Sequence, residues 1–434
     1  VFELLGAAVS LAIYKIVSID ASWSTLPDYI NTEKASGIVV SILLSVAISF
    51  SVGMLVQYIS RLLFTFQFDK KIRTVGVFFG GIAMSAIAYF ILIKGLKEVT
   101  FMPADLKAWI ATHEFMLLGG SFIFFTLLSF ILTRLQVNIL KVIIIVGTFA
   151  LALSFAGNDL VNFIGVPVAA YLSIGIFEQV AGADPNSYMM AALASDDMVA
   201  PVWILIAAGL VMVFTIWTSK KAKTVIETEM NLSSQSSGDD KFKSNALSRN
   251  IVRGFVSIGT VLSYVMPRSL QATLDKQFEN PILSKKKSAD EPMFDMVRAS
   301  VNLMVASSLI ALGTSMKLPL STTYVTFMVA MGSAFADRAW DRESAVYRVS
   351  GVFHVIGGWF VTAACAFIGA FILAYLLKVG GMVAFVITLL VLAYLLYLNA
   401  RSHDKKVKAK ELLKENLAKN EIQTLQQVTE SSAS

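Results

Sequence analysis

The sequence is poor in cysteine, histidine and charge, and each shortage excludes a class of protein. Its 434 residues include one cysteine, Cys365, and three histidines, so an intramolecular disulfide is impossible and a cysteine-ligated metal site is not expected. Charged residues make up only 15% of the chain, whereas hydrophobic residues make up 56%. This composition lies outside the range of soluble globular proteins. The sequence therefore predicts an integral membrane protein.

The apolar residues occur in runs of about 20, which is the length that a helix needs to cross a hydrocarbon core about 30 Å thick. A transmembrane barrel would instead show strands of about ten residues with alternating polarity. We therefore expect an all-α, polytopic helical bundle. The single spans are expected at 1–19, 37–63, 75–96, 115–133, 202–218, 349–377 and 382–398.

Two apolar runs are much longer than one span and are interrupted by polar residues. The run 139–176 contains Gly157, Asn158 and Asp159, and the run 297–335 is interrupted at 317–323. We expect a broken helix or a re-entrant hairpin in each run, because irregular backbone inside a membrane occurs only where it lines a polar interior. Two such segments in one chain are typical of secondary transporters with inverted repeats.

The distribution of charge predicts four parts and an orientation. Transmembrane helices occupy 1–219 and 297–399, a loop occupies 220–296, and a charged tail occupies 400–434. Basic residues cluster beside particular span ends, including those around Arg61, which predicts that the loop and the tail are cytoplasmic in a multi-pass protein of the cell (inner) membrane. We expect the net charge of +6 to report this orientation and not a nucleic-acid partner. Within the loop, 251–274 is expected to lie along the membrane surface, with a helix packed under the bundle as the alternative.

Asp159 is the clearest candidate for a functional residue. An ionisable side chain inside a membrane span is costly, so it usually marks an ion or substrate path. Asn158 is adjacent and Asn162 follows three positions later, on the same helix face. Gly157 would let the backbone leave helical angles, and a helix restarting at Leu160 would present free N–H groups. We expect Asn158 and Asp159 to bind a cation.

The second interruption offers three consecutive hydroxyl groups, those of Ser321, Thr322 and Thr323, at the start of a helix. Such residues often do no more than cap the helix. The same geometry also suits an anion, because hydroxyl donors add to the backbone N–H groups and to the positive end of the helix dipole. We therefore expect Ser321, Thr322 and Thr323, together with Asn162, to bind an anionic substrate.

These residues also carry a resemblance. The stretch 156–170 resembles the Asn-Asp signature of the PiT family of inorganic phosphate transporters, and 319–323 looks like the Ser-Thr-Thr element of that family. The resemblance implies two inverted repeats, each supplying one element of each kind to a shared site for phosphate and its coupling cation. Residues 1–8 resemble the stretch that follows the Ser-Thr-Thr element of the first repeat. By this resemblance the first repeat lies upstream of Val1, and the sequence is a fragment.

The expected function is import of inorganic phosphate by symport with Na⁺ or H⁺, through alternating access. The expected partners are phosphate, the coupling cation and the lipid bilayer, with no further cofactor, and Asn158 and Asp159 would hold Na⁺ in a sodium-coupled protein. Small-residue helix surfaces would permit a homodimer without requiring one. The alternatives are a sulfate permease of the same fold and a membrane phosphate sensor without turnover. An enzyme is not expected, because Asp159 has no recognisable nucleophile or base beside it.

Overall fold

The computed structural model describes the chain in segments whose regular structure is helical. The described residues are 2–20, 22–65, 71–94, 102–182, 184, 188, 190–194, 199–219, 249–250, 253–254, 257, 264, 267–278, 295–316, 318, 320–337 and 342–433. No strand occurs among these residues. Five of the helices are long and apolar enough to cross a membrane, which confirms the expected class at this level.

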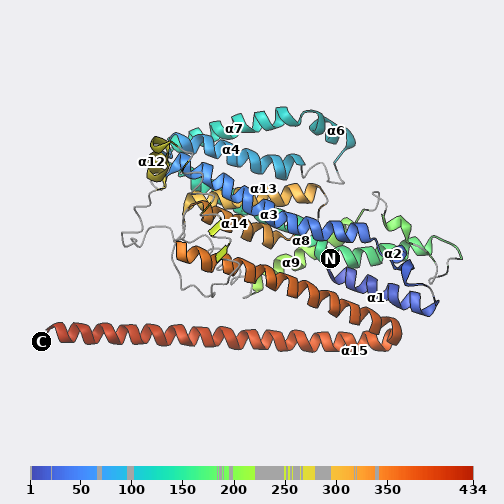
Figure 1. Cartoon of the computed structure of the whole chain (residues 1–434). Helices are drawn as coiled ribbons and strands as arrows, with labels where there is room; N and C mark the ends of the chain where they lie inside the picture. The colour runs from blue at the N-terminus through green and yellow to red at the C-terminus, as the bar shows by residue number, and fades with distance from the viewer. Residues whose placement is uncertain are drawn as a thin grey trace. The chain divides into compact units, whose positions relative to one another are not determined.

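Five of the expected single spans are present as helices close to the predicted positions. They are α1 (Phe2–Ser18), α3 (Thr32–Phe64), α4 (Val75–Ala88), α7 (Glu114–Arg134) and α9 (Val202–Thr218) (Figure 1). The shorter elements are η1 (Trp23–Thr25), α2 (Leu26–Tyr29), the π-helical turn η3 (Tyr89–Lys94), α6 (Ala104–Thr112), η4 (Ala191–Ala194) and α12 (Arg268–Gln277). The prediction for 251–274 lies mostly outside the described residues.

The expected break in the first long run is wrong. Helix α8 runs without interruption over Ile139–Glu178, through Gly157, Asn158 and Asp159, and it keeps Pro167 inside the helix. Its 40 residues correspond to about 60 Å, twice the thickness of a hydrocarbon core. A continuous helix satisfies its backbone groups internally, which is the favoured solution where water is absent.

The expected break in the second long run is confirmed. Helix α13 covers Met296–Ser315 and helix α14 begins at Thr322 and ends at Ala336. The Leu318 N–H donates to the Gly313 carbonyl at 2.9 Å, which closes the end of α13. Leu320 packs directly on Gly313, where a Cβ atom would overlap its side chain. The two helices pack against each other and form a hairpin, called here the α13–α14 hairpin.

The contacts within the chain define two compact units, of which the larger is Glu33–Gly357. In this unit most of α13 is buried, and it packs against α8, α4 and α14. Glycines allow close approach: a Cβ at Gly332 would overlap the backbone of Phe50 on α3, and one at Gly147 would press on Leu303. Small residues at such crossings are typical of helix packing in membranes.

The other unit comprises Val1–Thr32 and Gly358–Ser434. Most of helix α15 (Arg342–Ala433) belongs to it, and this helix is interrupted at Gly381, whose φ of 53° is accessible to glycine at little cost. Figure 1 shows the helix reversing direction between two arms. The kink separates the two spans expected at 349–377 and 382–398. Gly6 of α1 packs against the backbone of Phe367 on the first arm.

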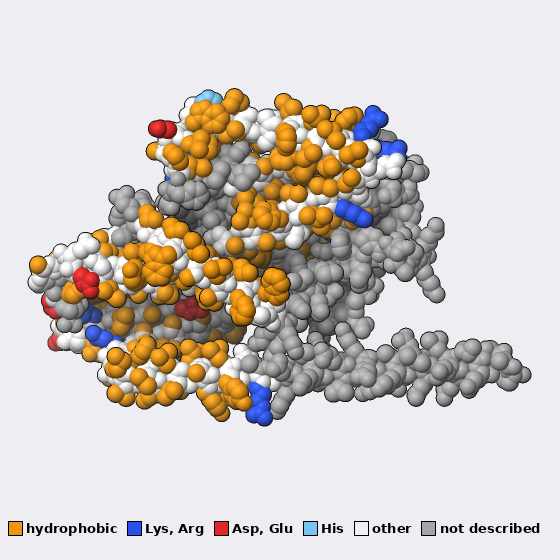
Figure 2. Space-filling model, turned by 180° about the vertical axis from the view of Figure 1, so that it is seen from behind, with side chains coloured by type: hydrophobic (Ala, Val, Ile, Leu, Met, Phe, Trp, Pro, Cys, Tyr) orange, Lys and Arg blue, Asp and Glu red, His pale blue; other side chains and the backbone are white. Residues whose placement is uncertain are grey.

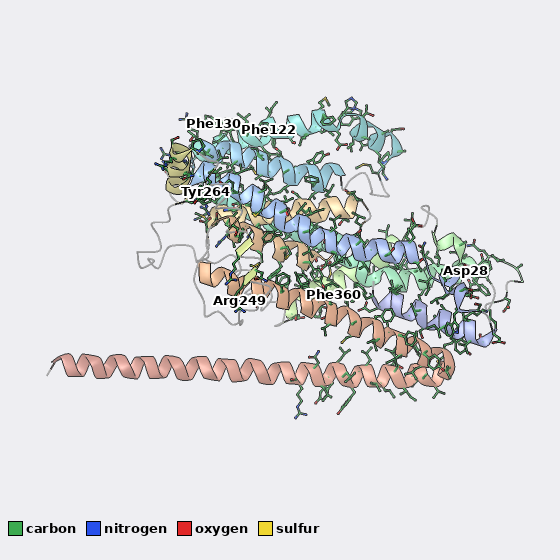
Figure 3. The ribbon with its side chains drawn as sticks, viewed as in Figure 1. Asp28, Phe122, Phe130, Arg249, Tyr264 and Phe360 are labelled. Atoms are coloured by element: carbon green, nitrogen blue, oxygen red, sulfur yellow. The ribbon has the colours of Figure 1, made fainter. Side chains whose placement is uncertain are left out.

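The described surface is strongly apolar. Figure 2 shows hydrophobic side chains over most of the described surface on one side of the molecule, with few charged groups. Phe130 on α7 and Phe360 on α15, both labelled in Figure 3, are exposed. Exposed apolar area of this extent marks an interaction surface, and on helices of this length the lipid of a membrane covers it. The predicted orientation of the spans and loops stays a prediction.

Candidate functional site

Asp159 and Thr322 come together although 163 positions separate them. The Thr322 hydroxyl lies 3.1 Å from each carboxylate oxygen of Asp159 and donates to them. Thr322 is the first residue of α14 and is only 3% exposed, while Asp159 lies on the α8 surface. One residue of each of the two predicted motifs, the acidic Asp159 and the hydroxylic Thr322, is therefore in direct contact.

Asn158 makes a second contact between α8 and the hairpin. Its side-chain N–H₂ group donates to the Thr314 hydroxyl at 3.3 Å, and that hydroxyl donates in turn to the Ile310 carbonyl. Asn158 is 6% exposed. Thr314 was not among the residues predicted from the sequence, although its place in the last turn before the interruption is a signal that points to it.

The remaining predicted residues are placed differently. Ser321 is the N-cap of α14, and its hydroxyl accepts a 3.4 Å hydrogen bond from the Tyr324 N–H, so it performs the capping role considered from the sequence. Thr323 is exposed on the first turn of α14. The side chain of Asn162 lies outside the described residues. The structure thus brings together Asn158, Asp159 and Thr322 from the predicted set.

Because α8 is continuous, the expected free N–H groups at Leu160 are absent. The only helix start among the residues just described is that of α14, where Thr322 lies. The oxygen ligands that this part of the structure could offer to a metal ion are one carboxylate, one amide and two hydroxyls. They belong to Asp159, Asn158, Thr314 and Thr322. Such a set suits a hard cation. An anion would be attracted to the α14 N-terminus by its N–H groups and its dipole.

The site lies at the tip of the α13–α14 hairpin. Three hydrogen bonds show that α13 and α8 run parallel: Ser300 Oγ to the Leu140 carbonyl at 3.4 Å, Ser154 Oγ to the Ser307 carbonyl at 3.2 Å, and Asn158 to Thr314. With 20 residues in α13, the tip is about 30 Å from the start of the hairpin. The distance equals about one hydrocarbon thickness.

A buried charged cluster lies at the opposite end of the hairpin. Arg61 of α3 is fully buried, and its guanidinium pairs with Asp337, just after α14, and with Asp295, just before α13. Arg61, which was expected among the cations near span ends that set the orientation, is in addition paired inside the bundle at the last turn of α3. Because residues at both ends of the hairpin pair with the same guanidinium, α14 ends at the same end of the bundle at which α13 begins.

Asp295 precedes the first residue of α13 and so lies outside the candidate span. Burial alone would raise its pKa. The positive charge of Arg61 and a 2.9 Å hydrogen bond from the Arg298 N–H outweigh this effect, and the pKa of the Asp295 carboxyl is held below its ordinary value. The carboxyl is therefore charged at neutral pH.

Comparisons with protein-family models, with curated proteins and with solved structures give no match for this chain.

Proposed function

We propose that the protein is a secondary transporter that imports inorganic phosphate together with Na⁺ or H⁺. The observation that carries this proposal is the contact between the Asp159 carboxylate and the Thr322 hydroxyl at the start of α14. It unites a fixed negative charge for a cation with a helix N-terminus suited to an anion. The two motifs in contact are also the two that resemble the PiT family.

The energetics require a coupling cation. At neutral pH phosphate carries between one and two negative charges, and moving it inward against a negative-inside potential costs about 2.3 kcal/mol per charge per 100 mV. Phosphate at the α14 N-terminus would also be repelled by Asp159. A cation bound by Asp159 and Asn158, with Thr314 as a further oxygen ligand, offsets both terms.

The Thr322 hydroxyl supplies the coupling between the two ligands. It has one proton, which it donates to Asp159 in the absence of ligands. A cation on the carboxylate competes for the same oxygens and leaves the hydroxyl free to donate its hydrogen bond to a phosphate oxygen instead. Ser321, Thr323 and Asn162 belong to the phosphate side of the site, and alternating access by rocking of inverted repeats completes the proposal.

The test is uptake of radiolabelled phosphate into proteoliposomes that contain the purified full-length protein. An imposed Na⁺ gradient is compared with an imposed proton gradient, and we expect uptake with one of them. Asp159→Asn should lower the affinity for the cation and for phosphate by at least about tenfold each, as reciprocal coupling demands. Asp105→Asn, which changes an exposed carboxylate on α6, is the matched control.

Three outcomes would contradict the proposal in different ways. Cation-dependent phosphate binding that survives Asp159→Asn would remove Asp159 from the site. Uptake of sulfate without phosphate would assign the other tetrahedral anion to the same fold. Phosphate binding without uptake under either gradient would identify a membrane sensor.

A further inference from the structure

The charged cluster at the base of the α13–α14 hairpin joins the ends of three helices. Arg61 Nε donates to one oxygen of Asp337 at 2.8 Å and Nη2 donates to the other at 2.6 Å, which is a two-pronged contact. The same Nη2 atom lies 3.1 Å from Asp295. Nη1 donates to the Thr65 carbonyl at 3.2 Å, and Gln57, one turn earlier on α3, donates to Asp337 at 2.8 Å.

Helix capping explains only one of the two carboxylates. Asp295 is the N-cap of α13, where a negative charge is favourable. Asp337 is at the C-terminal end of α14, where the helix dipole opposes a negative charge. Its burial is therefore compensated by Arg61 and Gln57. Since apolar residues of similar size would often stabilise a fold equally well, the ion pair is better explained by the specific arrangement that it enforces.

We propose that Arg61 is a positioning residue that holds the α13–α14 hairpin at its base so that Thr314 and Thr322 reach Asn158 and Asp159 at its tip. This inference concerns the geometry of the hairpin and is independent of which ion or anion the tip binds. It goes beyond the proposed function, because a failure of phosphate uptake would leave it unaffected.

Because the hairpin is long, a small change of angle at its base produces a large displacement of its tip. Over the length of α13, a tilt of about 5° at the base displaces the tip by ~3 Å. The tip contacts are hydrogen bonds of 3.1 and 3.3 Å, which are lost when the donor and acceptor separate by a further ångström. The fork of Arg61 opposes such a tilt because it binds one carboxylate through two atoms and the other through a shared atom.

The test measures the distance between spin labels on the tip and on α8. Met316 is 60% exposed just after Thr314, and Phe163 is 75% exposed one turn beyond Asp159. Both are changed to cysteine in a Cys365→Ser background, since Cys365 is exposed. Electron–electron double resonance in nanodiscs then gives the width of the distance distribution, without phosphate and without a membrane potential.

Two changes at the base keep the test decisive if one of them impairs folding. Arg61→Lys keeps the charge but cannot form the fork. The double change Arg61→Leu with Asp337→Leu removes the buried guanidinium together with its two-pronged partner, while Asp295 keeps its hydrogen bond from the Arg298 N–H. We expect each change to broaden or shift the distribution of distances between the two spin labels by ~3 Å, which is the displacement that a tilt of about 5° produces at the tip. Arg134→Leu, at the equivalent last turn of α7, is the matched control and should leave it unchanged.

A distribution as narrow as that of the parent, and centred at the same distance, in both Arg61→Lys and the double variant would overturn the inference. The cluster would then contribute to stability alone. Broadening in Arg134→Leu as well would also overturn it, because the effect would not be specific to the base of the hairpin.

Discussion

Two polar interruptions of apolar runs have opposite outcomes in this protein. The one at 157–159 is carried within the continuous helix α8, whereas the one near 317–321 separates α13 from α14. Gly157, Asn158 and Asp159 are tolerated inside a helix because the two polar side chains find hydroxyl partners on the hairpin. The second interruption carries its own start signal, the Ser321 cap. Polar residues in an apolar run therefore do not by themselves predict a break in the helix. Whether the helix continues depends on the partners that their side chains find.

The largest effect is expected from a substitution that forces the α13–α14 hairpin away from the helix packed against it. In Gly332→Ala the new Cβ would overlap the Phe50 carbonyl oxygen, which is backbone and cannot give way easily. We expect a loss of about 3 kcal/mol in unfolding free energy, the upper part of the range for overpacking. Thermal unfolding in detergent, followed by circular dichroism, measures it. Gly209→Ala, where a Cβ meets open space on α9, is the control and should not lower the unfolding free energy.

The contact between the two interruptions can be removed at one atom. Thr322→Val keeps the shape of the side chain but removes the proton that reaches Asp159, so the cation and phosphate should no longer strengthen each other's binding. We expect about a tenfold loss of phosphate affinity at saturating cation, a typical coupling energy. Isothermal titration calorimetry measures this loss.

Thr326→Val is the matched control for that change, one turn further along α14. Its hydroxyl donates to the Thr322 carbonyl and does not reach Asp159. Its phosphate affinity should stay within about twofold of the parent, since no coupling contact is lost. Equal effects of the two changes would count against a role for the Thr322 hydroxyl in coupling.

The start signal of α14 can be tested alone. Ser321→Ala removes the hydroxyl that accepts from the Tyr324 N–H, and loss of such a cap costs about 1 kcal/mol. The measurement is the unfolding free energy in detergent. An unchanged value would mean that other features of the interruption suffice to start the helix.

Gly157→Ala tests whether helix α8 is continuous through the first interruption. Gly157 is helical and a Cβ there meets nothing within 4 Å, so alanine should stabilise α8 by about 0.5–1 kcal/mol. Had the chain broken at Gly157 in a glycine-specific conformation, the same change would destabilise the protein. The sign of the change in melting temperature distinguishes the two.

The smallest effect is the dependence of stability on pH at the base of the hairpin. The folded-state pKa of Asp295 lies below its unfolded value, so its contribution is complete above about pH 4 and is lost as the pH falls through the folded-state value. Arg61, Arg298 and Asp337 are the charged groups around it. Melting temperatures between pH 8 and pH 3 should fall less steeply at the acid end in Asp295→Asn than in the parent.

The sequence predicts the helical class and most helix positions well, because apolar runs of fixed length are local signals. The span 202–218 coincides with α9, and the kink at Gly381 falls between two predicted spans. The prediction of a break in α8 was wrong because Gly157 permits a break without requiring one. The pairing of Asp159 with Thr322 was expected only in general terms, through the family resemblance. Thr314 and the Arg61 cluster were missed because their partners are more than 150 positions away.

The long separation of these partners has a consequence for synthesis. Asp159 leaves the ribosome 163 residues before Thr322, and Arg61 leaves 276 residues before Asp337. At about 5–20 residues per second, each waits for roughly ten seconds or longer. During that interval neither Arg61 nor Asp159 has its partners on the hairpin, and a charged residue near the middle of a helix, as Asp159 is in α8, opposes insertion by about 3 kcal/mol. The hairpin is made late, and its arrival gives Arg61 two carboxylate partners and gives Asp159 a hydroxyl donor. Packing of α3 and α8 around these residues must therefore await the synthesis of α13 and α14.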